Sequence, residues 1–106
     1  MIRPAEVTVR ALIDHSADMD GKKWVDTFAE LWSDPKSSKR IVALIHDMAT
    51  RGPVIPLKVR LIGFQAAVGK DYVAVVHDGR HRLAAAYALM INAVPVTWVD
   101  EAGEPA

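Results

Sequence analysis

Three consecutive basic residues directly follow a glycine in the run Asp78-Gly79-Arg80-His81-Arg82. An apolar run at residues 73–76 precedes this motif and an alanine-rich run at residues 83–86 follows it, so the sequence predicts a turn from a strand into a helix. Cations at a helix N-terminus are unfavourable unless an anion neutralises them, and the free N–H groups there bind phosphate well. We therefore expect Gly79, Arg80, His81 and Arg82 to bind a phosphate-bearing ligand.

Asp78 is the candidate catalytic and metal-binding residue of this motif. Beside a bound phosphate, its carboxylate would hold Mg²⁺ or accept a proton from an attacking hydroxyl group. A structural role is equally open, because Asp78 could cap the helix or pair with Arg80 or Arg82.

The composition excludes several classes of site and partner. The chain has no cysteine, so disulfides, thiolate metal sites and cysteine nucleophiles are excluded. A formal net charge of zero argues against sequence-independent binding to DNA or RNA. No apolar leader follows the polar start at residues 1–6, and no run is long enough to span a membrane. We expect one cytoplasmic domain over residues 1–106.

The elements that must position the motif begin with a predicted strand at residues 6–13, where apolar and polar residues alternate. Residues 14–23 carry turn signals. Apolar residues then recur at helical spacing from Trp24 to Trp32, and Pro35 ends this helix.

A second helix follows, for which Ser37 or Ser38 is the expected cap. Gly52-Pro53 ends it. Its buried stripe is predicted to contain Ile41, Leu44, Ile45 and Met48.

The second half predicts strands at residues 55–61 and 72–76, joined by a hairpin connection at residues 63–71. Apolar and basic residues alternate in the first of these strands, whereas the second reads as buried on both faces.

A helix over residues 80–90 follows, with Asn92 as its stop signal, then a strand at residues 94–99 and a frayed polar tail. The predicted buried stripe of this helix is Leu83, Ala86, Tyr87 and Met90. The mixture of short strands and helices is typical of an α+β fold, with a mixed β-sheet flanked by helices. Residues 72–99 read as a right-handed βαβ crossover, whose ligand would bind beyond its first strand.

Two pieces of the chain resemble the ParB/sulfiredoxin superfamily. In residues 41–59 a helix is followed by a glycine and an apolar-Pro-apolar strand. Residues 78–86 (DGRHRLAAA), with AVPV at residues 93–96, resemble the family signature DGxHRxxAA … VPV. The resemblance covers residues 39–100, whereas residues 1–38 match no family pattern and residues 101–106 form a tail.

The resemblance implies a single domain of the ParB/sulfiredoxin-like fold that binds a nucleotide. The superfamily includes the CTP-binding domain of chromosome-partitioning ParB, the ATP-dependent enzyme sulfiredoxin and a free serine kinase, and the DGxHR form is closest to the kinase. By resemblance, Gly79, Arg80, His81 and Arg82 would hold the phosphates of ATP or CTP with Mg²⁺. The reaction would then be hydrolysis or phosphoryl transfer.

Departures from two members of the superfamily limit what this resemblance implies. Sulfiredoxin has its catalytic cysteine directly after the glycine, where this chain has Arg80, so the sulfiredoxin reaction is excluded. Partitioning ParB has an acidic residue at this position, and it carries a helix-turn-helix and a dimerisation domain that 106 residues are not expected to accommodate.

Two other functions are open. The short chain and the tryptophan-containing helix favour a non-enzymatic protein-interaction module, such as an accessory protein of a phage or mobile element, with Trp32 as a candidate contact. Stand-alone members of the superfamily are often labelled ParB-like nucleases, but no second carboxylate lies close to Asp78 in sequence to form a two-metal site.

Overall fold

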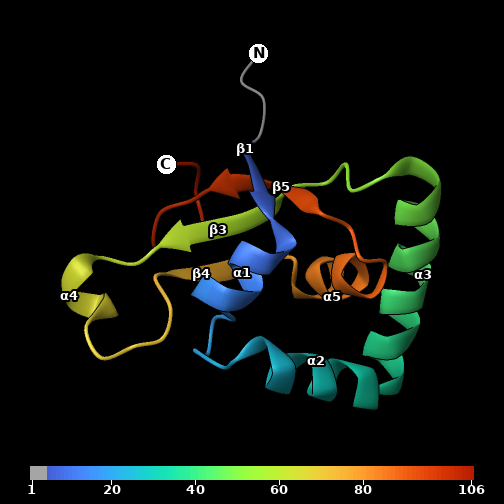
Figure 1. Cartoon of the computed structure of the whole chain (residues 1–106), viewed down its shortest axis with the longest axis horizontal. Helices are drawn as coiled ribbons and strands as arrows, with labels where there is room; N and C mark the ends of the chain where they lie inside the picture. Colours follow the sequence, from blue (N-terminus) through green and yellow to red (C-terminus); the bar gives the residue numbers. More distant parts are fainter. Residues whose placement is uncertain (1–4) are drawn as a thin grey trace.

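The structure is a computed structural model that describes residues 5–106 (Figure 1). The polar start at residues 1–4, on which the expected lack of a leader partly rests, lies outside the described residues. The elements, in chain order, are β1 (Ala5–Thr8), α1 (Val9–His15), β2 (Ser16–Ala17), α2 (Trp24–Ser33), α3 (Pro35–Arg51), β3 (Leu57–Leu61), α4 (Phe64–Ala67), β4 (Ala74–Asp78), α5 (Arg80–Ala88) and β5 (Ala93–Trp98).

The strands form one mixed sheet in the order β1-β5-β3-β4-β2. The pairs β1–β5 and β3–β4 are antiparallel, whereas β3–β5 and β2–β4 are parallel. The predicted α+β class with a mixed sheet is therefore confirmed, and so is the predicted hairpin between β3 and β4. Its connection contains the short helix α4, which the sequence pattern did not indicate.

The predicted βαβ crossover at residues 72–99 is wrong. Both β4 and β5 pair with β3, but β4 is antiparallel to β3 and β5 is parallel to it, so β4 and β5 run in opposite directions. The order strand-helix-strand does not by itself fix the relative direction of the two strands, which here is set by the pairing of each with β3.

Helix α5 lies in the core between the sheet and α3 (Figure 1). Four consecutive residues, Leu83 to Ala86, are at most 1% exposed, because small alanine side chains let neighbouring elements approach on more than one side. The predicted stripe is correct for Leu83 and Ala86. It is wrong for Tyr87 and Met90, which are 56% and 90% exposed.

The predicted boundaries of α2 and α3 are nearly correct, but the cap of α3 is not. Asp34, rather than Ser37 or Ser38, is the N-cap, and its carboxylate accepts a hydrogen bond of 2.9 Å from Ser37 N. Pro35 occupies the first turn, where a missing N–H costs nothing. The predicted buried stripe is confirmed, with Ile41 and Met48 buried and Leu44 and Ile45 partly buried against the core.

The predicted strand at residues 6–13 is correct only as far as Thr8, where β1 ends; the rest of this range lies in α1, which begins at Val9. The Thr8 hydroxyl oxygen accepts a hydrogen bond of 3.1 Å from Ala11 N, which caps the helix. Val9, Leu12 and Ile13 have the spacing of one helix face as well as an apparent alternation, so the pattern was ambiguous.

The end of the chain also differs from the prediction. Helix α5 ends at Ala88, and the residue with left-handed backbone is Met90 (φ 57°) rather than Asn92. Residues 100–106 are not frayed: Val99 bridges to Pro105, Ala106 N donates to Trp98 O at 3.0 Å, and the Asp100 carboxylate accepts from two backbone N–H groups of the turn.

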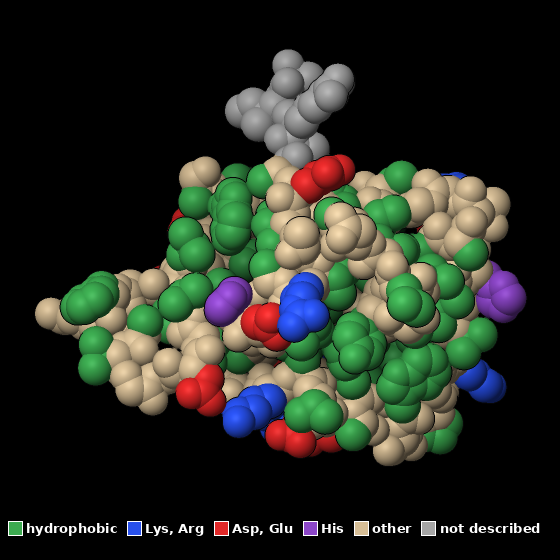
Figure 2. Space-filling view, viewed as in Figure 1, with side chains coloured by type: hydrophobic (Ala, Val, Ile, Leu, Met, Phe, Trp, Pro, Cys, Tyr) green, Lys and Arg blue, Asp and Glu red, His purple; other side chains and the backbone are tan. Residues whose placement is uncertain are grey.

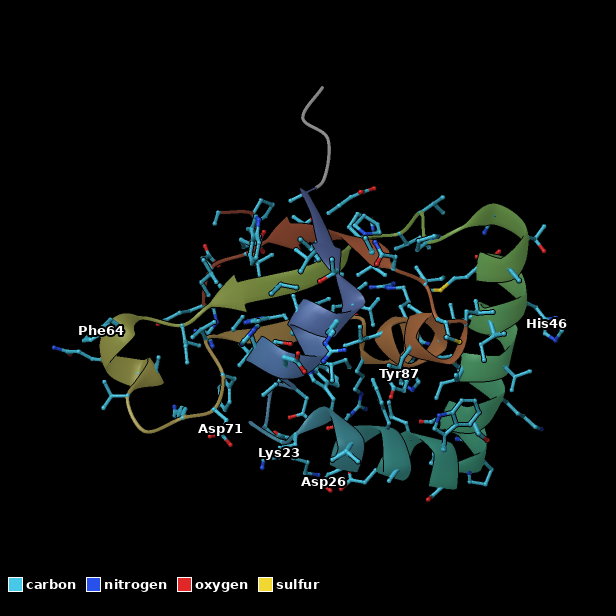
Figure 3. All side chains as sticks on the ribbon, in the orientation of Figure 1. Lys23, Asp26, His46, Phe64, Asp71 and Tyr87 are labelled. Atoms are coloured by element: carbon cyan, nitrogen blue, oxygen red, sulfur yellow. The ribbon has the colours of Figure 1, made fainter. Side chains whose placement is uncertain are left out.

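Helix α4 projects from one end of the molecule, opposite α3 (Figure 1). Phe64 on α4 is 87% exposed, and Figure 3 shows it at the end of the molecule opposite His46. In Figure 2, hydrophobic side chains are spread over the visible face, including the projecting end, and charges of both signs are interspersed among them. Within residues 5–106, no helix has the length and apolar character needed to cross a membrane.

Candidate functional site

Gly79 makes the turn between β4 and α5. It is the N-cap of α5 with φ +119°, a left-handed conformation that side chains rarely adopt. A Cβ atom here would lie 2.6 Å from Leu57 Cγ and 3.2 Å from Leu57 Cβ, on the buried side of β3. Glycine is therefore required both for the backbone conformation and for the close packing of the turn on β3.

The N-terminus of α5 has no side-chain cap. The first helical hydrogen bond of α5 is donated by Leu83 N to Gly79 O, at 2.8 Å. The N–H groups of the three basic residues before Leu83 belong to the first turn, where a helix offers no internal acceptor. The turn therefore has the donors that an anion requires, as the sequence predicts.

The three basic side chains have three different environments. Arg80 is exposed. His81 is partly buried, with Nε2 at 3.1 Å from the Ser37 hydroxyl oxygen on α3. The side chain of Arg82 is only 15% exposed, and its terminal nitrogen donates to the Asp78 carboxylate at 3.3 Å and to Pro56 O at 3.4 Å.

The Asp78 carboxylate neutralises the charge of Arg82 only in part. Asp78 is 63% exposed and its contact with Arg82 is long, so the pair is weak. Arg82 Nε is buried and has no hydrogen-bond partner among residues 5–106. Arg82 thus connects the turn to Pro56, just before β3, while its Nε–H group has no acceptor among the described residues.

His81 is disfavoured as a cation. Its pKa is lowered, first by burial and then by the charges of Arg40 and Arg80, with Asp34 acting in the opposite direction. The sequence-based expectation that His81 would meet a phosphate as imidazolium therefore requires an anion close enough to raise this pKa again.

All five predicted site residues, from Asp78 to Arg82, line one pocket of about 370 Å³. Three further charged residues line it as well: Arg40 from α3, and Asp18 and Asp20 from the loop after β2. The sequence did not single these out. Arg40 directly precedes the buried Ile41, but only the fold shows that this side of α3 faces the α5 turn, and Asp18 and Asp20 had the pattern of an ordinary turn.

Asp18 holds one wall of the pocket in place. Its carboxylate accepts from Asp20 N at 2.9 Å, from Lys22 N at 3.0 Å and from the Thr27 hydroxyl at 2.7 Å. Burial alone would raise the pKa of Asp18, but these hydrogen bonds and the charge of Lys22 outweigh it, so the pKa is lowered from its ordinary value. Both carboxylate oxygens are used, which gives Asp18 a structural role.

Asp18→Asn is expected to lower the free energy of unfolding by about 2 kcal/mol at pH 7, because it weakens hydrogen bonds to a charged acceptor. Since the folded-state pKa is depressed, the stabilisation by Asp18 is present above the unfolded-state pKa and is lost as the pH falls through the folded-state pKa. Urea unfolding should therefore show the difference from the original chain shrinking between pH 6 and pH 3. Asp20→Asn, in the same turn, is the control and should change stability little at either pH; an equal gap for Asp18→Asn at both pH values would contradict the assignment.

His77 lies just before the motif and has a structural partner. Its Nε2 accepts a hydrogen bond of 2.9 Å from Arg60 Nε on β3, and Nδ1 faces Gly103 of the folded-back tail. The contact engages the partly buried Arg60, and His77 also lines the pocket.

A magnesium site would need more than the protein ligands. Within the described part of the chain, no group of three His, Cys, Asp or Glu side chains is placed to hold a metal ion. Mg²⁺ is often bound by one or two carboxylates together with phosphate oxygens and water, and the exposed Asp78 fits that arrangement beside a bound phosphate.

Comparison with known proteins adds no family to this geometry. A scan against protein-family models, a search of curated proteins and a search of solved structures each found no match.

Proposed function

We propose that the pocket at the start of α5 binds a nucleoside triphosphate with Mg²⁺, with ATP and CTP as the candidates. The observation that carries this proposal is that one pocket is lined by the uncapped turn Gly79-Arg80-His81 and also by Arg40 from a different helix. The resemblance to the ParB/sulfiredoxin superfamily supports the same assignment.

In this proposal, phosphate oxygens accept hydrogen bonds from the N–H groups of the first turn of α5. Arg80 supplies positive charge from α5 and Arg40 from α3, and the guanidinium group of Arg82, which also lines the pocket, adds a third positive charge. Asp78 would hold Mg²⁺, whose charge would offset the negative charge that develops during hydrolysis or phosphoryl transfer.

Arg80→Ala is expected to weaken nucleotide binding about tenfold to a hundredfold, because one charge-assisted hydrogen bond contributes about 1.5–3 kcal/mol. Titration calorimetry with ATP, CTP and GTP in the presence of Mg²⁺ measures this change. Arg10→Ala is the matched control, since the Arg10 side chain is 91% exposed on α1, outside the pocket, and its removal changes the net charge equally. No binding at millimolar nucleotide, or equal losses in the two variants, would reject the proposal.

A protein-interaction role is the second candidate, favoured by one observation on α2. Val25 and Trp32 lie seven residues apart, hence on one helix face, and are 71% and 43% exposed. If this stripe binds a protein partner, a pull-down should recover it in stoichiometric amount with the original chain and not with Trp32→Ala.

A further inference from the structure

Ser37, on the first turn of α3, lies between a carboxylate and an imidazole. Its hydroxyl oxygen is 3.1 Å from His81 Nε2. On its other side, Asp34 accepts from Ser37 N at 2.9 Å, and hydrogen bonds from the backbone and side chain of Ser37 lower the pKa of Asp34. Ser37 and His81 are 44 positions apart, so this contact is made by the packing of α3 against α5.

His81 is suited to accept a proton from Ser37. In the chain without nucleotide, burial and the neighbouring charges of Arg40 and Arg80 lower its pKa, which favours the neutral imidazole. The Ser37 hydroxyl has one proton, which it donates either to Asp34 or to His81; in the tautomer of His81 with a proton on Nδ1, Nε2 is the acceptor. A serine hydroxyl hydrogen-bonded to a neutral imidazole is the usual arrangement for activating a serine nucleophile.

The dyad adjoins the proposed nucleotide site. His81 and Arg40 line the pocket; Ser37 is not one of the lining residues, but it contacts His81 and lies three residues before Arg40 on the same helix. Positive charge from Arg40 and Arg80 would stabilise a transferring phosphoryl group. In the triads of hydrolases, the carboxylate contacts the imidazole. Here the Asp34 carboxylate contacts Ser37 instead.

We propose that Ser37 is a phosphoryl acceptor: its Oγ attacks the γ-phosphorus of the nucleoside triphosphate in the pocket, and the chain phosphorylates itself. The Oγ–P bond forms while the bond from the γ-phosphorus to the β,γ-bridging oxygen breaks. The hydroxyl proton passes to His81 Nε2, and the nucleoside diphosphate leaves with the electron pair of the broken bond. This inference rests on the proposed nucleotide binding.

Ser38 provides a matched control. It is the next residue on the same helical turn, is also partly buried, and its hydroxyl donates to Pro35 O at 3.2 Å rather than to an imidazole. Activation by His81 should therefore distinguish two adjacent serines.

The first arm of the experiment needs no nucleotide. Diisopropyl fluorophosphate, a reagent for activated serines, should label Ser37 in preference to Ser38, as read by peptide mass spectrometry. Ser38→Ala should keep the labelling rate, Ser37→Ala should abolish it, and His81→Gln should lower it about a hundredfold, the usual contribution of a general base. In the unmodified chain the rate should fall with decreasing pH as His81 becomes protonated, a readout that does not depend on any variant folding.

The second arm uses MgATP and MgCTP, with binding followed by calorimetry and phosphorylation by intact mass. A gain of one phosphoryl group that maps to Ser37 supports the inference. Nucleotide binding with neither labelling nor phosphorylation at Ser37 overturns the inference alone. Labelling of Ser37 without nucleotide binding supports its activation by His81 but overturns the nucleotide as donor, and with it the proposed function.

Discussion

Gly79→Ala is expected to destabilise the chain by about 3 kcal/mol. The left-handed backbone costs a non-glycine residue about 1–2 kcal/mol, and overpacking a buried site costs about 1–3 kcal/mol more. The added methyl group would lie 2.6 Å from Leu57 Cγ, and Leu57 is 1% exposed in the middle of the sheet, so it has no space to move into. Urea unfolding monitored by circular dichroism measures the loss.

Gly69→Ala separates the two causes. Gly69 also has positive φ (+79°), but no atom lies within 4 Å of the position of an added Cβ. It should cost only the conformational part, about 1–2 kcal/mol. Equal losses in the two variants would show that the contact with Leu57 contributes nothing.

Gly79→Ala is also expected to weaken the proposed nucleotide binding. If Gly79→Ala relaxes by shifting the turn away from β3, the N–H groups of α5 shift with it. At a temperature where the variant is still folded, nucleotide affinity should therefore fall more than in Gly69→Ala.

Trp24→Ala is expected to cost about 3–5 kcal/mol, the usual range for removing a buried aromatic side chain. Trp24 is 2% exposed, its ring packs on Phe28 with centroids 5.6 Å apart, and its Nε1 donates to the Ser16 hydroxyl oxygen at 3.0 Å. The substitution leaves a cavity and removes the hydrogen bond that Trp24 donates to buried Ser16. Because domains of this size are typically stable by only about 5–15 kcal/mol, denaturant unfolding should show a large loss or a partly unfolded chain.

Trp32→Ala is the control on the same helix. Trp32 is 43% exposed, and its removal should change stability by about 0.5 kcal/mol or less. A small effect of Trp24→Ala would indicate that the N-terminal segment is not part of the core.

Local patterns predicted most of the helices and strands. The stripe Ile41, Leu44, Ile45 and Met48 and the stop at Gly52 are correct, because each depends on spacing or backbone freedom within one element. The errors arose where tertiary contacts decide. The alternation at residues 6–13 fits either element type, and the insertion of β3 between β4 and β5 depends on pairing between distant segments.

The candidate site shows the same division. Residues 78–82 were predicted to act together, and they line one pocket because they are consecutive in a turn. Arg40, Asp18 and Ser37 were not predicted as site residues, because they reach the turn only through the packing of other elements around α5. The sequence left open whether Asp78 would pair with Arg80 or Arg82; the structure shows the pair with Arg82, while Arg80 is exposed. The contact of Arg82 with Pro56 O depends on the packing of the turn on β3 and could not be predicted.

The outermost strands of the sheet, β1 and β2, both come from the first 17 residues of the chain. A fragment restricted to residues 39–100 would retain the complete motif but would expose unpaired backbone along both margins of a three-stranded remnant. Such margins recruit other chains, so the fragment should self-associate. The N-terminal segment, which carries none of the residues of the motif, is therefore expected to keep the inner strands from pairing with other chains.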